Sequence, residues 1–488
     1  MTGGTNMNLA RICFLSFIFI CNASSAATNN LRILSFDPNG ILTFQTLPAA
    51  ASYQVEWTTN ISASEWSSSA PGITNIPAEA AERQTITVAV NYSACCYRVL
   101  VSSSNEWLSV TGDHITGQHS NVVQLRGINI YFGSFRGEVE PDMINEDDPV
   151  QKNFLDGMLR NIVTEKDFAD MRQMGMNMAR LGLSTYKDFE NDAVPFTYFE
   201  QNFESLDRLV EAASRQQIYL IFNMRQSPGG HNFSPHSGNE GKNELWENSE
   251  YQNRLVKLWE TIANRYKDQP IIAGYDVINE PDAPNREALN EVYTKLIAGI
   301  RSNDSRHIIF LEGNTWATNL ALINPPSDSN CALSVHFYKP AWYTHLIETG
   351  DYPNVEEGFT KEALHTAIVE RVRNSLGLPV WVGEFGAKTY QPTYLTYSQD
   401  VKNVLDEIGL SWSYYSYKNT KGSLGSWAIY EMYQDNLFHQ CVKNFDPDLM
   451  SFGDFLAQYS EEELTAILES LQTIHFYKKE ELWEMLSK

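Results

Sequence analysis

The chain has 488 residues, a formal net charge of -24 and a sequence isoelectric point near 4.8. That length exceeds one ordinary domain, and 43 % hydrophobic with 12 % aromatic residues suits a globular protein with a sizeable core. The acidity argues against nucleic acid and an anionic membrane surface as partners, and it makes a strongly anionic polymer an awkward substrate.

The first residues have the pattern of a secretory signal peptide. Arg11 precedes an apolar run over residues 12–21, and small residues from Ser24 to Ala26 provide a cleavage site. The run is too short to span a bilayer, and no later stretch is long and apolar enough to do so. We therefore expect residues 1–26 to be a signal peptide of a secreted protein that is extracellular, periplasmic or held at the cell surface.

Export would permit disulfide bonds, but the cysteines show no framework for them. Beyond the signal region the chain contains Cys95, Cys96, Cys331 and Cys441, and a bond between the two neighbours would be strained. The sequence has neither paired CxxC motifs nor HExxH, so it indicates no zinc site.

Residues 30–103 differ from the rest of the chain. Short alternating runs such as ILTFQTL and QTITVAV are separated by turn residues, for example DPNG at 37–40. This pattern predicts a small antiparallel β-sandwich. The segment resembles the fibronectin type III-like modules found ahead of secreted bacterial enzymes, through YQVEW and CYRV. A spacer or packing partner is favoured over a sugar-binding module, because a fold alone does not define a function.

A polar linker is expected over residues 104–120, and beyond it strand-like runs alternate with helical ones. Such alternation is typical of parallel βα units. Eight units over about 300 residues predict an α/β fold, a (β/α)8 TIM barrel at 121–435. The expected strands cover residues 122–131, 176–184, 218–224, 272–279, 307–313, 331–338, 379–385 and 410–417.

Two helical regions stand out. One helix is expected over residues 249–268, with Ser249 able to cap its start. Residues 436–488 are acidic and helical in pattern, and we interpret them as a packed C-terminal extension, with a loosely held tail as the alternative. The first helix has one apolar face formed by Leu255, Leu258, Trp259, Ile262 and Tyr266.

Two glutamates stand where a barrel of this kind places its catalytic residues, at the C-terminal ends of strands. Glu280 closes the fourth expected strand and Glu384 the seventh, so their carboxylates would face each other across the barrel mouth. Glycoside cleavage needs such a pair: one protonates the leaving oxygen, and the other stabilises or attacks the oxocarbenium-like centre. We expect the strand and Pro281 to fix Glu280, which would carry a proton near neutral pH.

Further polar side chains at the expected strand ends suit the same chemistry. Asn279 has an amide that can hold a substrate hydroxyl or orient the nucleophile, and Arg180 and Tyr338 can hydrogen-bond the Glu384 carboxylate. Residues such as Arg180 and His336 are more often structural when taken singly. Their order and their placement at successive strand ends favour a common site.

This order of motifs resembles the retaining glycoside hydrolases of family 5, cellulase-like enzymes with catalytic glutamates on strands four and seven. The resemblance covers about residues 115–430 and implies that Glu280 is the acid/base and Glu384 the nucleophile. The subsite for the cleaved sugar would then be lined by Arg180, Asn279, His336 and Tyr338. The matching motifs are LRGINI (125–130), GMNMARLG (175–182), PGGHN (228–232), LWETIANRYKDQPIIAGYDVINEP (258–281), SVHFYKPAWYTH (334–345) and PVWVGEFG (379–386).

Two positions depart from the family pattern. Members usually have a His at the end of strand three, where this chain has Arg225, and a Trp ending strand eight, where it has Tyr415, with Trp412 three residues earlier. An Arg adds a permanent charge and a longer reach, and a Tyr offers a smaller stacking face. We expect Arg225 and Tyr415 to contact substrate, so the usual contacts of the family do not transfer directly.

Several tryptophans are candidate sugar platforms, because aromatic faces stack on the apolar faces of sugars. Trp342, in the long loop after the sixth strand, is the best candidate. For it and for Trp246, Trp316 and Trp427, core packing is the alternative.

The sequence therefore predicts a secreted, monomeric glycosidase without a cofactor. It would hydrolyse the O-glycosidic bonds of a neutral β-glucan, β-mannan or related glycan with retention, through a two-glutamate double displacement. Two alternatives stay open: a catalytically inactive barrel that binds carbohydrate, and an adhesion or scaffold role through the sandwich module. Sugar identity, linkage and endo or exo action are open as well, because family 5 covers many substrates.

Overall fold

The computed structural model describes the chain from Glu106 to Lys488, except residues 119, 133–147, 239–240, 346–349, 421–425 and 447. Before Glu106 it describes only the strands β1 to β6, so the expected signal peptide lies outside the described residues. The chain divides into two compact units. One comprises Met1–Glu106 with Ser214–Gln217, and the other comprises Trp107–Ala213 with Ile218–Lys488.

The N-terminal strands form two three-stranded sheets. One has the order β1-β2-β5 and the other β4-β3-β6, and every pairing in them is antiparallel. The connecting loops lie outside the described residues, so the fibronectin type III-like module at 30–103 stays a prediction. The strands are β1 (Ile33–Phe36), β2 (Ile41–Gln45), β3 (Ala50–Thr58), β4 (Ile76–Pro77), β5 (Arg83–Thr87) and β6 (Cys96–Ser103).

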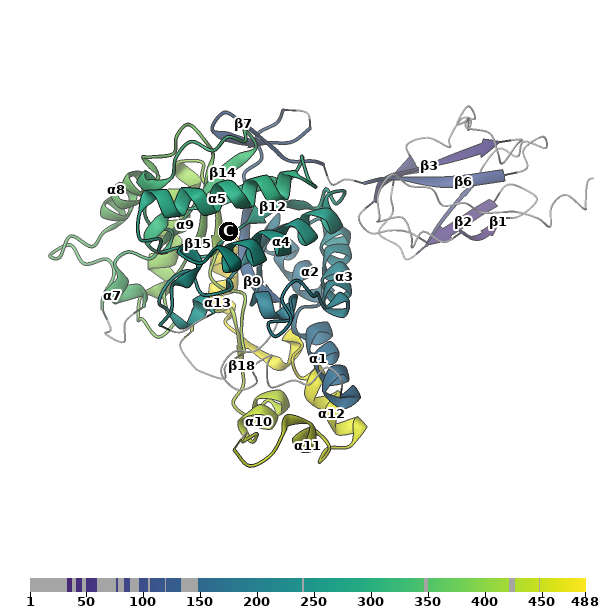
Figure 1. The fold of residues 1–488 in the computed structure, drawn as a ribbon. Helices are drawn as coiled ribbons and strands as arrows, with labels where there is room; N and C mark the ends of the chain where they lie inside the picture. The colour runs from purple at the N-terminus through teal and green to yellow at the C-terminus, as the bar shows by residue number, and fades with distance from the viewer. Residues whose placement is uncertain are drawn as a thin grey trace, which may run out of the picture. The chain divides into compact units, whose positions relative to one another are not determined.

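Eight parallel strands close into a barrel in the order β9 to β16, with β16 pairing back onto β9 (Figure 1). This confirms the predicted (β/α)8 barrel, and each expected strand overlaps an observed one. The strands are almost entirely buried, as in parallel sheets that helices cover on the outside. They are β9 (Arg126–Phe132), β10 (Met178–Leu183), β11 (Tyr219–Met224), β12 (Ile272–Asp276), β13 (Ile308–Glu312), β14 (Cys331–Phe337), β15 (Val380–Phe385) and β16 (Ser411–Tyr414).

Helices surround the barrel (Figure 1). The predicted apolar face of α4 (Ser249–Tyr266) is confirmed, because each of its residues is buried. The predicted cap at Ser249 is wrong by one residue: the Asn248 side chain accepts a hydrogen bond from the Glu250 N–H and begins the helix. The other helices of this layer are α1 (Pro149–Ile162), α2 (Glu165–Gln173), α3 (Glu200–Gln216), α5 (Arg286–Arg301), α6 (Asn314–Ala317), α7 (Ala341–Thr344), α8 (Lys361–Val372) and α9 (Tyr394–Glu407).

Most of the segment predicted as a polar linker at 104–120 instead packs against the N-terminal end of the barrel. There, β7 (Ser109–Thr111) and β8 (His114–Thr116) form an antiparallel hairpin. Leu108 and Ile115 are buried in one apolar cluster with residues of the barrel strands, among them Trp381. The linker prediction was wrong here because Ser, Thr, Gly and Asp outnumber the few apolar residues that anchor the hairpin.

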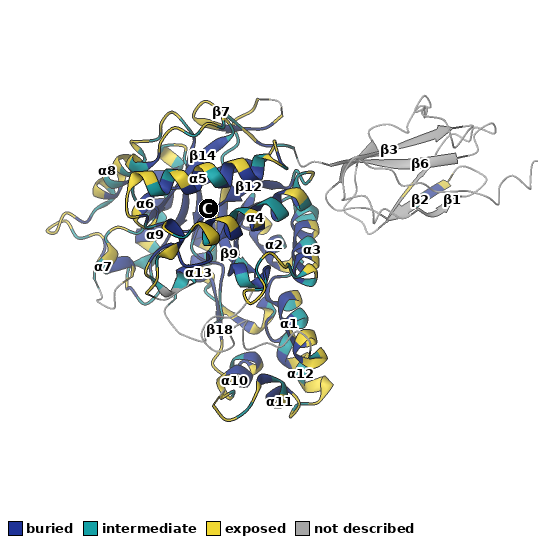
Figure 2. Cartoon of the chain, in the orientation of Figure 1, coloured by how far each residue is buried: buried dark blue, intermediate teal, exposed yellow. Residues whose placement is uncertain are grey.

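The residues after β16 pack onto the barrel through a small sheet and short helices. Buried residues occur in these elements as well (Figure 2). Ile467 and Leu482 are buried, and the Thr473 hydroxyl hydrogen-bonds the Asp167 carboxylate on α2. Of the helices in the described residues, none has the length and apolarity that crossing a membrane requires. The elements are β17 (Lys418–Asn419), β18 (Tyr430–Met432), α10 (Leu437–Lys443), α11 (Phe452–Leu456), α12 (Glu461–Glu469), β19 (Phe476–Lys478) and α13 (Glu480–Leu486).

Candidate active site

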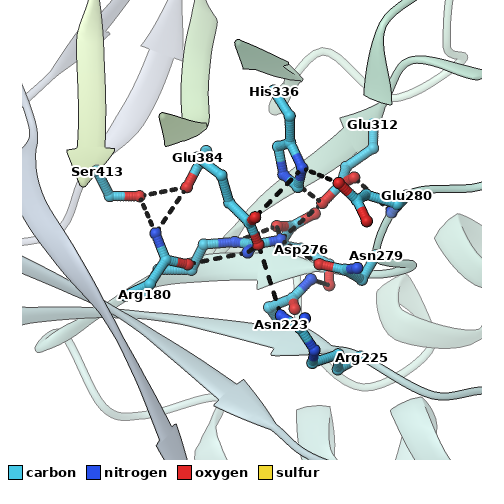
Figure 3. Close-up of polar contacts among 12 residues, drawn as sticks. Arg180, Asn223, Arg225, Asp276, Asn279, Glu280, Glu312, His336, Glu384 and Ser413 are labelled. Carbon is cyan, nitrogen blue, oxygen red and sulfur yellow. Dashed lines mark hydrogen bonds and ion pairs between the residues drawn. The ribbon is translucent and has the colours of Figure 1, made fainter. Parts of the chain in front are cut away.

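Most of the predicted site residues meet at the C-terminal end of the barrel, among them Arg180, Glu280 and Glu384 (Figure 3). Arg180 lies on β10, and His336 and Glu384 are the next-to-last residues of β14 and β15. Asn279 and Glu280 follow β12, which ends at Asp276, so the expectation that the strand itself fixes Glu280 is wrong. The turn after the strand must hold the carboxylate instead.

Hydrogen bonds on both sides of its backbone hold Glu280 in that turn. Its N–H donates to Glu312 Oε2 at 2.7 Å, and its carbonyl accepts from Asn232 Nδ2 at 2.8 Å. Its φ of 51° lies in the left-handed region, which costs a residue with a Cβ free energy. Such a conformation persists only where neighbours enforce it, and it is frequent at functional sites.

Arg180 is the hub of the polar network, and it is fully buried. Its Nη1 donates to Glu384 Oε1 at 2.6 Å and its Nη2 to Glu312 Oε1 at 2.7 Å. Burial alone would lower the pKa of Arg180, but the carboxylates of Asp276, Glu384 and Glu312 outweigh it and raise the pKa. The guanidinium also donates hydrogen bonds to Asp276, Asn129 and Asn279.

Glu384 is held at both carboxylate oxygens. Its Oε1 accepts a hydrogen bond from Arg180 Nη1 and lies 3.6 Å from Arg225 Nη1. Its Oε2 accepts a hydrogen bond from the Tyr338 hydroxyl at 2.9 Å. The predicted contacts of Arg180 and Tyr338 with Glu384 are therefore present. They fix the orientation that an attacking carboxylate requires.

Glu280 faces two histidines. His336 Nδ1 lies 2.8 Å from its Oε1, and His236 Nε2 lies 3.0 Å from its Oε2. Burial alone would raise the pKa of Glu280, but the hydrogen bonds from His236 and His336 hold it well below its usual range. The expectation of a carboxyl that keeps its own proton near neutral pH is therefore wrong, because two imidazoles stabilise the charged form.

The pKa of His336 shifts in the opposite direction to that of Glu280. Burial alone would lower its pKa, but the charges of Glu384 and Glu312, together with the hydrogen bonds to Glu280 and Glu312, raise the pKa to about 10. Its ring lies 3.5 Å from Glu312 and 3.7 Å from Glu384. His336 is thus a cation held among carboxylates.

A cavity of about 890 Å³ opens beside Glu280. Trp316, Trp342 and Phe359 form aromatic parts of its lining. Glu280 is partly buried. An aromatic-lined hollow next to such an acid is the usual form of a site for a small organic ligand such as a sugar.

A model of cellulases, glycosyl hydrolase family 5, matches residues 146–421 of the chain. The chain belongs to glycosyl hydrolase family 5. Membership assigns it to the glycosidases, hydrolases that cleave glycans.

Three curated relatives carry different activity names. A "Beta-xylosidase" of Phanerodontia chrysosporium is 27 % identical, and the match covers 72 % of this chain and 76 % of that protein. "Endoglucanase C" of Acetivibrio thermocellus is 27 % identical, over 38 % of this chain and 52 % of its own length. "Mannan endo-1,4-beta-mannosidase 3" of Arabidopsis thaliana is 27 % identical, and the match covers 42 % of this chain and 58 % of that protein. The chain thus spans little more than half the length of the last two.

Solved structures show the same fold at low sequence identity. Thermotoga maritima Cel5A with cellobiose matches with a TM-score of 0.50 and 18 % identity, over 75 % of this chain and 97 % of that one. A structure described as a glycoside hydrolase matches with a TM-score of 0.51 and 20 % identity, and the match covers 69 % of this chain and 99 % of that one.

The two residues that depart from the family 5 pattern lie beside the nucleophile candidate. The Arg225 guanidinium hydrogen-bonds the Tyr131 hydroxyl and lies over two rings, 4.7 Å from the centroid of Tyr131 and 5.6 Å from that of Tyr415. Arg225 Nη1 also lies 3.6 Å from Glu384 Oε1. The expected substrate contact stays a prediction, and the placement suits it. Trp412, the neighbouring tryptophan, is buried in the core.

The candidate platforms differ in position. Trp342 and Trp316 line the cavity, and Trp316 is 41 % exposed. Trp427 lies edge-on to Tyr415 at 5.8 Å. Trp246 is buried, and its Nε1 donates to the His231 carbonyl, so its role is core packing.

Sequence reasoning missed three residues that touch Glu280, namely Glu312, His236 and Asn232, whose amide donates to the Glu280 carbonyl. Glu312 ends β13, in the run HIIFLEG, so the strand-end rule could have found it. His236 lies in the loop after β11, where spacing gives no signal, because only folding brings it to Glu280.

One trio of side chains has the spacing of a metal site. Ligand atoms of Glu280, His336 and Glu384 all lie within 4.8 Å of one another. The Arg180 guanidinium contacts Glu384, and His336 is itself cationic, so a metal ion would meet two positive charges here. The trio suits two carboxylates that act on one bond better than a bound cation.

Proposed function

We propose that the protein hydrolyses β-glycosidic bonds of a neutral glycan with retention of the anomeric configuration. The observation that carries the proposal is the closeness of the two carboxylates, with an oxygen of Glu280 and one of Glu384 within 4.8 Å. Retaining glycosidases place these groups about 5–5.5 Å apart, whereas inverting ones need about 6.5–9.5 Å to admit a water.

Glu384 is proposed as the nucleophile. Arg180 and Tyr338 hold its two oxygens, so the carboxylate needs little reorientation before it attacks carbon. The covalent glycosyl-enzyme that results is then hydrolysed by water, and two inversions give net retention.

Glu280 is proposed to deliver the proton to the leaving oxygen and later to take one from the attacking water. Asn279 has a role beside it, since its buried Nδ2 has no hydrogen-bond partner among the described residues. A buried donor without a partner is costly, and a substrate hydroxyl would satisfy it. Because Arg180 fixes the amide oxygen of Asn279, the free donor keeps one direction.

The substrate is proposed to be a β-glucan, β-mannan, β-xylan or related neutral glycan. The net charge of -24 disfavours an anionic polymer. The relatives named above act, by their names, on xylosides, glucans and mannan, and the one with the widest coverage is the β-xylosidase. The signal-like pattern at residues 1–26 supports secretion.

The proposal is tested by trapping the covalent intermediate. The purified protein is first screened on aryl β-xylosides, β-glucosides and β-mannosides and on the matching polysaccharides. An activated 2-deoxy-2-fluoro derivative of the best sugar should then inactivate it, and peptide mass spectrometry should find the sugar on Glu384. Turnover without labelling, or labelling of another residue, would reject the assignment, and absence of turnover would favour the inactive, carbohydrate-binding alternative.

A further inference from the structure

Both carboxylate oxygens of Glu280 meet an imidazole. Oε1 lies 2.8 Å from His336 Nδ1 and Oε2 lies 3.0 Å from His236 Nε2. Because its backbone is also fixed on both sides, Glu280 has little freedom to turn either oxygen away. A proton that passes from Glu280 to a leaving oxygen therefore departs from an atom that faces a histidine.

The two histidines have different surroundings. The His336 side chain is 1 % exposed, and its ring also lies near Glu312 and Glu384, so three carboxylates hold its proton. The His236 side chain is 29 % exposed, and its Nε2 also lies 3.4 Å from the Asn232 amide. Of the two histidines, His236 is thus the one that solvent reaches.

His236 also lies on the side where a leaving group would sit. It lines the cavity beside Glu280 together with Trp316 and Trp342. His236 therefore borders the space beside Glu280 in which a leaving group would be held.

We propose that His236 is a positioning residue that holds the proton which Glu280 delivers to the leaving oxygen and takes back from water. This inference rests on the proposed function. It assigns to His236 a task in proton transfer that neither the family motifs nor the strand-end rule indicates.

The proton transfers balance in both steps. In the first, the C1–O bond breaks as Glu384 attacks C1, and the leaving oxygen takes a proton from Glu280 Oε2, which takes one from His236 Nε2. In the second, water attacks C1, the ester bond to Glu384 breaks, and the proton of water passes through Oε2 back to Nε2. No oxidant, reductant or cofactor is required.

The charge of Glu280 agrees with a proton that is held by His236 and delivered by Glu280. Burial would raise its pKa, but the two histidine hydrogen bonds hold it well below its usual range, so the carboxyl is ionised at neutral pH. A general acid in that state needs a neighbour that holds its proton, and the two groups then titrate as a pair. The other titratable and charged groups that face the pair are Arg225, His231, Glu312, His336, Tyr338, His345 and Glu384.

The test uses His236→Gln in the full-length chain and a series of aryl β-glycosides of the preferred sugar. Poor leaving groups need a proton and good ones do not, and general acid catalysis contributes about 10²–10⁴-fold. We expect kcat/KM to fall about 100-fold for the unsubstituted phenyl glycoside and less than about threefold for the dinitrophenyl glycoside.

Two further variants separate proton transfer from structure. His236→Ala should recover activity on the phenyl glycoside when imidazole is added, and Glu280→Gln should not. His114→Gln, on the exposed hairpin at the other end of the barrel, should match the wild type. Equal losses on both glycosides, or no loss on either, would overturn the proposal while leaving the proposed function intact. A wild type that hydrolyses no glycoside would overturn both.

Discussion

Replacing Arg225 by alanine should lower kcat/KM without unfolding the protein. The guanidinium donates to the Tyr131 hydroxyl, lies 3.6 Å from Glu384 and covers the ring of Tyr415. A hydrogen bond to a charged group contributes about 1.5–3 kcal/mol. If the substrate takes over one such bond in the transition state, its loss corresponds to about 10- to 150-fold in rate. We therefore expect kcat/KM on the best substrate to fall by at least about tenfold.

Steady-state kinetics and thermal unfolding of matched variants check this reasoning. Arg225→Lys keeps the charge but not the planar fork, so it should lose nearly as much as alanine. Arg373→Ala, an exposed arginine beyond α8, should change neither kinetics nor melting temperature. Wild-type kinetics in Arg225→Ala at unchanged melting temperature would refute the substrate contact. A fall in melting temperature that accounts for the lost activity would make Arg225 a structural residue.

Three further predictions concern the acids, the amide and the N-terminal unit. With an activated aryl glycoside, Glu280→Ala should accumulate the glycosyl-enzyme, and azide should restore its turnover. Glu384→Ala should lose turnover. A retained glycosyl azide formed by Glu384→Ala would mean that Glu384 is the acid/base and Glu280 the nucleophile. Asn279→Asp removes the free donor, so kcat/KM should fall about 10- to 100-fold, and an unchanged value would exclude the hydroxyl contact. A chain that begins at Glu106 keeps the β7–β8 hairpin and should retain kcat on a soluble substrate. Loss of kcat in a folded truncation would show that the N-terminal unit shapes the site.

The barrel could be predicted because its signal is local and repeated. Each strand is a short apolar run that helical periodicity separates from the next, and parallel strands of one barrel must end at one face. That rule brings His336 and Glu384 together. The structure places both in one polar network with Arg180, which lies in the middle of β10 rather than at its end.

The remaining features depend on contacts that no local pattern encodes. His236 reaches Glu280 through a loop, and the low pKa of Glu280 depends on two histidines whose approach only the folded chain defines. The strand-end rule could have found Glu312 but could not predict that it binds the backbone of Glu280. The hairpin near Ile115 was mistaken for a linker because a few buried side chains anchor a polar segment.

The central claim is that two carboxylates act on one glycosidic bond through a covalent intermediate. Proton NMR of the first product formed from the preferred β-glycoside, recorded before mutarotation, tests it directly. With oxygens of Glu280 and Glu384 within 4.8 Å, the account predicts that the β-anomer appears first and the α-anomer grows in slowly. An α-anomer as the first product would mean direct attack by water and would contradict the mechanism.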